Sequence, residues 1–359
     1  MKTLLLTILS AIIGQIMFIG CAADGPRNAW RIEGTAKSDN AADTFYIVSE
    51  TDRDTIATLY ARDGQIVPLQ DTVGHNTLCR IAASGHRRVQ TMLICLEYGT
   101  IRLDIDLTGE RKAIDNMGGT PLNEALRRFF LARQFDYEHG TLDDWRQRCR
   151  RITAEVCNIV ARYPDHPISE FVIWMDFNVM PPQVVDSLLN SLSAPVRLRN
   201  YVSIVEEQNP FRYGSQEGDL LKDARGIDLH TGDSVRMSDF IGHGQYVLLD
   251  FWGSFCRPCI ATMPRLQEIY ERCKGNGLLM VGVMPRMSNN VERAREIVQQ
   301  QGVTYPQVAD IKTMSTYGVC SYPTLMLIDP DGQICTPCGA DPGIILADVE
   351  RRFGNGIGQ

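Results

Sequence analysis

This 359-residue chain has few histidines and no excess of positively charged residues. Its six histidines do not cluster, and 36 lysines and arginines face 43 aspartates and glutamates, which gives a formal net charge of −7. A zinc site needs closely spaced nitrogen or sulfur ligands, and a nucleic-acid surface needs a basic patch. We therefore expect no metal, no cofactor and no nucleic-acid partner.

The chain also lacks internal repeats, low-complexity tracts and heptad arrays. These absences argue against solenoids, disordered tails and coiled coils. Hydrophobic residues make up 44% of the chain and charged residues 22%, which is typical of folded proteins with ordinary cores. At this length we expect about two or three domains.

The first twenty residues have the composition of a targeting segment. Lys2 supplies a positive charge, and the apolar run from Leu4 to Gly20 is short for a membrane span. The run ends in Phe18-Ile19-Gly20-Cys21, which resembles a lipobox. We expect a lipoprotein signal peptide over residues 1–20, lipidation of Cys21, and anchoring to a membrane in the cell envelope (periplasm). An ordinary signal peptide or an uncleaved anchor are the alternatives.

Two further regions precede the C-terminal part of the chain. Residues 27–118 contain short β-branched and aromatic runs separated by turn signals such as Asp63-Gly64, which predict a small all-β domain, an antiparallel sandwich or barrel. The expected strands lie at Phe45–Val48, Thr55–Tyr60, Thr91–Leu96 and Thr100–Ile105. Residues 119–208 have helical periodicity, which predicts a helical linker or subdomain.

The most informative stretch is Tyr246–Pro264, YVLLDFWGSFCRPCIATMP. An apolar run suited to a buried strand is broken by Gly253 and Ser254, and apolar residues then recur at helical spacing. Cys256 and Cys259 therefore stand where a helix begins, and the free N–H groups and macrodipole of a helix start stabilise a thiolate. Their spacing predicts two adjacent sulfurs that form a reversible disulfide.

A structural cysteine pair or half of a zinc site is the alternative at Cys256 and Cys259. A zinc site would need two more close ligands, and the other Cys-x-x-Cys pair, Cys335 and Cys338, is far along the chain. Redox chemistry is therefore favoured over metal binding.

Two separated motifs resemble the thioredoxin superfamily, and more closely its TlpA/ResA-type thiol-disulfide oxidoreductases, which are grouped with the AhpC/TSA proteins. The first motif runs from Asp250-Phe251-Trp252 through Cys256-Arg257-Pro258-Cys259 to Pro264, and the second is Cys320–Asp329. The resemblance covers residues 217–359 and implies an α/β thioredoxin-like domain, a mixed sheet flanked by helices. The β-rich region loosely resembles a domain of unassigned function that precedes thioredoxin domains in lipoproteins of some Gram-negative bacteria.

The chemistry assigns roles to these residues. Cys256, at the exposed helix start, is the expected attacking thiolate, and Cys259 resolves the mixed disulfide. Asp250, near the end of a buried strand, is expected to have a raised pKa and to accept the proton of Cys259; a merely hydrogen-bonded or solvated strand-end carboxylate is the alternative. The resemblance makes Pro323 the cis-proline that faces the dithiol. The expected active-site surface comprises Trp252, Phe255 (where the family usually has tryptophan), Arg257, Pro258 and Tyr322.

Cys320, Cys335 and Cys338 are additional to that site. Cysteines three apart in an extended strand lie too far apart to bond, so either Pro337 bends the chain or Cys335 and Cys338 are not bonded to each other. These three cysteines act either as an auxiliary relay for thiol-disulfide exchange or as small buried hydrophobic residues. Elsewhere, Cys149 and Cys157 fall on one expected helix, too far apart to bond, whereas a Cys79–Cys95 bond stays open.

Together these observations predict a lipid-anchored envelope thiol-disulfide oxidoreductase that acts on protein disulfides. The resemblance favours reduction, with electrons from a membrane thiol reductase. A thiol peroxidase is one alternative, although peroxidases place their reactive cysteine in a different motif. A binding or scaffold lipoprotein whose β domain captures a ligand is another.

Overall fold

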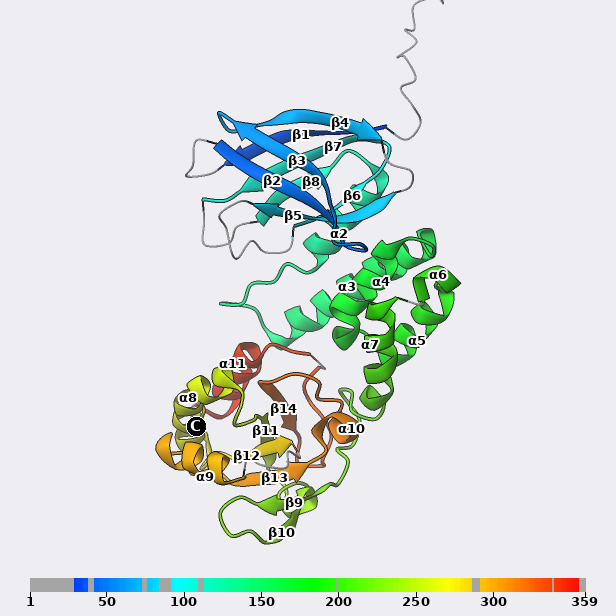
Figure 1. Cartoon of the computed structure of the whole chain (residues 1–359). Helices are drawn as coiled ribbons and strands as arrows, with labels where there is room; N and C mark the ends of the chain where they lie inside the picture. The colour runs from blue at the N-terminus through cyan, green and yellow to red at the C-terminus, as the bar shows by residue number, and fades with distance from the viewer. Residues whose placement is uncertain are drawn as a thin grey trace, which may run out of the picture. The chain divides into compact units, whose positions relative to one another are not determined.

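The computed structural model describes residues 29–37, 42–72, 76–83, 92–108, 113–197, 199–285, 291–337 and 339–354. The chain divides into two compact units, Met1–Arg127 and Arg128–Gln359 (Figure 1). The expected signal peptide, Cys21 and Cys338 lie outside the described residues. Within the described residues, none of the helices is both long enough and apolar enough to cross a bilayer.

The first unit contains one sheet of eight strands in the order β6-β5-β2-β3-β4-β1-β7-β8. Its end strands β6 and β8 contact each other, so the sheet is barrel-like. Inward-facing side chains such as Phe45, Ile47 and Ile101 are fully buried. The expected all-β domain is confirmed. Its strands are β1 (Ala29–Lys37), β2 (Ala42–Ser49), β3 (Thr55–Arg62), β4 (Gln65–Thr72), β5 (Thr77–Ala83), β6 (Met92–Leu96), β7 (Gly99–Asp106) and β8 (Ala113–Gly118).

One pair in this sheet departs from the expected antiparallel pattern, because β1 and β7 run parallel. Local hairpins give antiparallel pairs, whereas β1 meets β7 only when the chain returns around the barrel. The register of β1 against β4 shifts between Ile32 and Gly34. A Cβ at Gly34 would lie 1.9 Å from the carbonyl oxygen of Leu103 on β7, so this close approach requires glycine.

Cys79 and Cys95 lie on the neighbouring strands β5 and β6, and both are buried free thiols. The register pairs Cys95 with Leu78 and Cys79 with Ile94, so the two cysteines are offset by one residue. Burial raises the pKa of Cys79 to about 12 and raises that of Cys95 as well. Both therefore stay protonated and behave as small apolar groups.

Helix α2 (Pro121–Ala132) leads from the first unit into a helical region of the second. Helix α3 starts at a capping box in which Thr141 and Asp144 bond each other's backbone N–H groups. Its Leu142 and Trp145 belong to the same core cluster as Cys256. The region comprises α3 (Leu142–Arg162), α4 (Pro167–Asp176), η1 (Phe177–Val179), α5 (Pro182–Ser191), α6 (Ala194–Arg197), α7 (Asn200–Gln208) and η2 (Asn209–Arg212).

The rest of the second unit is built on a six-stranded mixed sheet in the order β10-β9-β13-β12-β11-β14. Strands β11, β12 and β13 are parallel, and β14 and β9 are antiparallel to their neighbours. The strands are β9 (Arg225–Asp228), β10 (Ser234–Arg236), β11 (Tyr246–Phe251), β12 (Leu278–Pro285), β13 (Gln307–Ile311) and β14 (Thr324–Ile328).

Helices cover both faces of this sheet (Figure 1). One face packs against α8 (Arg257–Cys273), α9 (Val291–Gln300) and α11 (Pro342–Phe353). The other packs against α10 (Thr313–Tyr317) and η3 (Met237–Asp239). Both faces of β11 are therefore buried, as its continuous apolar run predicts.

The Asp329-Pro330-Asp331-Gly332 turn after β14 predicts an antiparallel edge strand, which the structure does not form. Gln333 and Ile334 make only isolated bridges, to Leu220 and Ile328. The N–H of Leu327 donates to the hydroxyl of Thr336 and not to a backbone carbonyl. Pro337, which follows Thr336, has no N–H with which to continue a β-ladder.

Candidate active site

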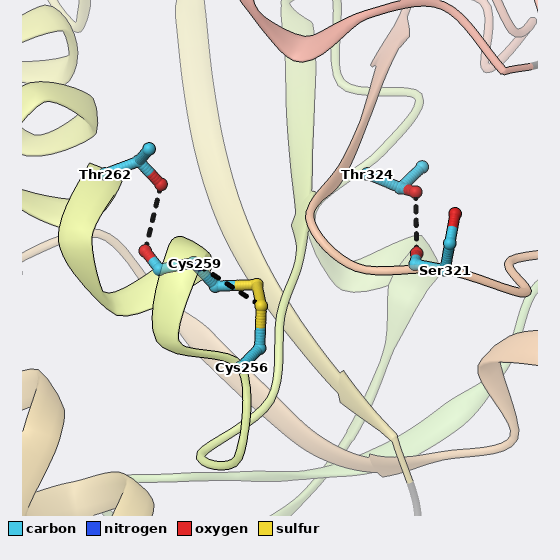
Figure 2. The surroundings of a disulfide bond; sticks show 5 residues. All are labelled: Cys256, Cys259, Thr262, Ser321 and Thr324. Carbon is cyan, nitrogen blue, oxygen red and sulfur yellow. Dashed lines mark hydrogen bonds between the residues drawn. A yellow bond between two sulfur atoms is a disulfide. The ribbon is translucent and has the colours of Figure 1, made fainter. Parts of the chain in front are cut away.

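A disulfide between Cys256 and Cys259 lies at the N-terminus of α8 (Figure 2). The two Cα atoms are 5.3 Å apart. Cys256 is the N-cap residue, and its sulfur accepts a hydrogen bond of 3.2 Å from the N–H of Cys259. Pro258 occupies the first turn, where its missing N–H removes no helical bond. After reduction, the same N–H and the helix dipole would stabilise a thiolate on Cys256.

Two residues expected to be exposed are buried. Cys256 is only 7% exposed, and Trp252 is 0% exposed instead of contributing to the active-site surface. The indole N–H of Trp252 donates to Gln307 at 2.9 Å, which satisfies its polar atom within the core. The side chains of Arg257 and Phe255 are exposed beside the disulfide, the latter by 52%.

The second motif forms a loop that faces the disulfide (Figure 2). The peptide bond between Tyr322 and Pro323 is cis. The hydroxyl of Thr324 donates to the carbonyl of Ser321 at 2.8 Å, which closes the turn around this bond. The ring of Tyr322 meets that of Phe255 edge to face, with centroids 5.8 Å apart. The two motifs thus form one aromatic-edged surface.

Asp250 lies on β11, on the sheet face that α8 covers. Val247, Leu249 and Phe251 point into one core cluster, whereas Leu248 points into the other, which also contains both cysteines. Because side chains alternate along a strand, Asp250 shares the face of Leu248. Its side chain is only 1% exposed, and burial raises its pKa to about 7. A carboxyl with that pKa can exchange a proton near neutral pH.

Tyr305 and Gln307 complete this face, although no motif in the sequence indicates a role for either residue. The hydroxyl of Tyr305 donates to Oδ2 of Asp250 at 3.1 Å, and the side chain of Gln307 donates to the carbonyl of Tyr305 at 3.2 Å. The side chain of Gln307 has room on this face because the residue paired with it on β12 is Gly282. A Cβ at position 282 would lie 2.0 Å from Oε1 of Gln307. Tyr305 lies 55 residues beyond Asp250, so no local pattern signals the contact.

Replacing Tyr305 with phenylalanine should raise the pKa of Asp250 further, because the mutation removes the hydrogen bond that favours the carboxylate. A buried hydrogen bond to a charged group corresponds to a rise of about one pH unit or more in the titration midpoint. Carbon-13 NMR of the labelled carboxyl group measures that midpoint in oxidised wild type and variant. The substitution Tyr317→Phe, on the other face of the sheet, is the control. A midpoint that stays in place would show that the Tyr305 hydroxyl does not affect Asp250.

Among the additional cysteines that the structure describes, Cys320 and Cys335 are not bonded to the dithiol. Cys320 is exposed and its thiol donates to the carbonyl of Gly318, whereas Cys335 is half-buried with a pKa raised by burial. Cys149 and Cys157 lie on one helix, α3, as expected, and no disulfide joins them. Across the described ranges, no set of three His, Cys, Asp or Glu side chains is placed to hold a metal ion.

Comparison with known proteins identifies relatives of the C-terminal part. The AhpC/TSA family model matches residues 218–336. Thiol-disulfide oxidoreductase ResA of Geobacillus kaustophilus (strain HTA426) is 30% identical over 153 residues, which is 41% of this chain and 81% of that protein. ResA of Bacillus thuringiensis (strain Al Hakam) is 33% identical over 105 residues, 29% of this chain, and the chain spans only 58% of that relative's length.

Among solved structures, the thioredoxin domain of a thiol-disulfide oxidoreductase from Bacteroides vulgatus is 27% identical, with a TM-score of 0.33. The match covers 38% of this chain and 96% of that domain. The family match falls on the region where the sequence predicts a thioredoxin-like domain, and together with the ResA relatives it confirms that fold class.

Proposed function

This chain belongs to the family of ResA thiol-disulfide oxidoreductases, and from that membership we propose that it exchanges the Cys256–Cys259 disulfide with disulfides of partner proteins. The observation that carries the proposal is the disulfide at a helix N-cap, with a buried carboxyl on the same sheet face. The loop opposite, which carries Tyr322 and lies between Ser321 and Thr324, supports it, because such a loop offers backbone groups to an extended partner chain.

The proposed reaction consists of two thiol-disulfide exchanges. In the reduced protein, the Cys256 thiolate attacks one sulfur of a partner disulfide, which forms a mixed disulfide and releases the partner's other sulfur as a thiolate. Asp250 accepts the proton of Cys259, whose thiolate then attacks Cys256. The products are the Cys256–Cys259 disulfide and a partner dithiol, so two electrons pass to the partner. A membrane thiol reductase would restore the dithiol.

A trapping experiment tests the order of these steps. The reduced Cys259→Ser variant should accumulate a mixed disulfide between Cys256 and an insulin chain, because no thiol remains to resolve it. The Cys256→Ser variant should accumulate little, since Cys259 is only 1% exposed. Mass spectrometry of the trapped species identifies the bonded cysteine. Trapping by Cys259 and not by Cys256 would reverse the roles.

The proposed setting is the cell envelope, with residues 1–20 as a lipoprotein signal peptide and Cys21 as the lipidated residue. Lys2, the apolar run and Gly20-Cys21 support this assignment. In this arrangement residues 27–118 and 119–208 lie along the chain between the lipidated residue and the redox domain, residues 217–359.

The substitution Cys21→Ser should move the protein from the membrane fraction to the soluble envelope fraction, because the lipid attachment site is lost. Immunoblotting of fractionated cells measures the distribution. The substitution Cys157→Ser, on α3, is the matched control. Equal membrane association of wild type and Cys21→Ser would contradict lipid anchoring.

A further inference from the structure

A cavity of about 200 Å³ lies between the helical region and the loop that carries the cis-proline. Phe177, Asn178 and Arg212 line it from the helical region. Ser321 and Thr324, which flank the Tyr322–Pro323 bond, line it from the loop. The helical region thus contributes a wall to a cavity beside the proposed docking loop.

The wall contains a buried cation. The side chain of Arg212 is only 1% exposed, and its guanidinium lies 5.7 Å from the ring centre of Phe177. It donates to the side-chain oxygen of Asn209 at 2.9 Å and to the carbonyls of Asn178 and Met180. Since Phe177 and Asn178 also line the cavity, the charge lies at that end of it.

This cation has no carboxylate partner among the residues that the structure describes. Arg212 forms no ion pair there, and its Nε is buried without a hydrogen-bond acceptor. The carboxylate of Asp186 reaches it only indirectly, through Asn209, which donates to Asp186 at 2.7 Å. A buried guanidinium with neutral partners is costly and favours an anion in its surroundings.

We infer that the cavity beside Arg212 binds an acidic side chain of the partner segment that docks on the Tyr322–Pro323 loop. The inference rests on the proposed function, because the partner is the disulfide substrate. The cavity has room for one side chain rather than for a helix or a folded domain. A segment extended along Tyr322 would direct alternate side chains to one side, where Ser321 and Thr324 line the cavity.

Reduction of short disulfide peptides tests the inference. In each peptide, one position near the cysteine carries glutamate or glutamine, and the position is varied along the peptide. At the matching position, wild type should prefer glutamate about tenfold in kcat/KM, mainly through KM, because the buried guanidinium attracts the carboxylate across the cavity wall. Arg212→Gln should reduce the preference to about one, whereas replacement of the exposed Arg293 on α9, Arg293→Gln, should retain it.

A second pair of variants covers the case in which Arg212→Gln does not fold. Ser321 is exposed on the loop, so Ser321→Asp places a negative charge at the cavity and Ser321→Asn is its neutral match. Only Ser321→Asp should abolish the preference for glutamate. Equal rates for glutamate and glutamine at every position in wild type would overturn the inference. The proposed function would stand in that case, since it fails only if the peptides are not reduced at all.

A chemical measurement examines the cavity's charge without turnover. Cys320 also lines the cavity and is exposed, and the disulfide protects the dithiol in the oxidised protein. Anionic iodoacetate, relative to neutral iodoacetamide, should modify Cys320 severalfold faster in wild type than in Arg212→Gln. Peptide mass spectrometry after timed quenching gives both rates. An unchanged ratio would show that no positive field acts in the cavity, contrary to the inference.

Discussion

Replacing Asp250 with asparagine is expected to raise the free energy of unfolding at pH 8 by up to about 4 kcal/mol, and by little near pH 4. Burial raises the pKa of Asp250 from 3.8 to about 7 in the folded protein, whereas the unfolded chain keeps the ordinary value. Between these values the folded state retains a proton that the unfolded state has lost. Wild-type stability therefore falls as the pH rises through this range and levels off above about pH 7.

Asparagine avoids this loss because it does not titrate, and its side-chain oxygen can still accept the Tyr305 hydroxyl. Urea unfolding of the oxidised proteins at pH 4, 6 and 8 measures the difference between wild type and variant. Asp331→Asn, on an exposed turn, is the control for removing one negative charge. A stability difference that is independent of pH would contradict a raised pKa for Asp250.

The same substitution tests the proposed proton transfer. If Asp250 accepts the proton of Cys259, the rate of mixed-disulfide resolution in wild type should rise through a midpoint near pH 7, where the carboxylate forms. Asp250→Asn should lose that midpoint and resolve more slowly above it. Stopped-flow measurement of resolution across pH 5 to 9 compares the two. An unchanged profile would remove Asp250 from the mechanism and leave it a structural carboxyl.

Replacing Cys256 with serine should lower the rate of insulin disulfide reduction by about 10³-fold or more, because the attacking thiolate is lost. The fold should tolerate the change, since Cys256 is the N-cap of α8 and serine is a favoured N-cap residue. The rate of insulin precipitation under a constant supply of dithiothreitol measures the activity, and circular dichroism checks the fold.

The control for this experiment is Cys157→Ser, which removes a half-buried thiol from α3 and should leave the rate unchanged. Wild-type-like activity in Cys256→Ser would contradict the proposed role of the disulfide.

Peroxide consumption should be slow in wild type and independent of Cys256. Rapid consumption that disappears in Cys256→Ser would instead support the thiol peroxidase alternative.

Local patterns allowed much of the catalytic module to be predicted. The apolar run of β11, the break at Gly253 and the helical spacing after Cys259 place a dithiol at a strand–helix junction, and the structure has its disulfide there. The mixed sheet also follows from the alternation of strands and helices. These features depend on residues that are near one another in the chain, so local residue patterns indicate them.

Features set by distant contacts could not be predicted in the same way. The sequence places Trp252 and Cys256 beside an exposed helix start, but both belong to a core cluster drawn from several elements, and Trp252 donates to Gln307 on β13. In each case a partner from elsewhere in the chain overrides the local preference.

The sequence by itself determined the kind of chemistry, because two cysteines three residues apart at a helix start suffice to define a reversible disulfide. Only the tertiary structure decided what surrounds that disulfide. Tyr305 reaches Asp250 across 55 residues, and Arg212 lines a cavity with Ser321 across more than a hundred. Burial and electrostatic fields arise from such long-range packing. The order of residues in the sequence does not show which distant residues come into contact.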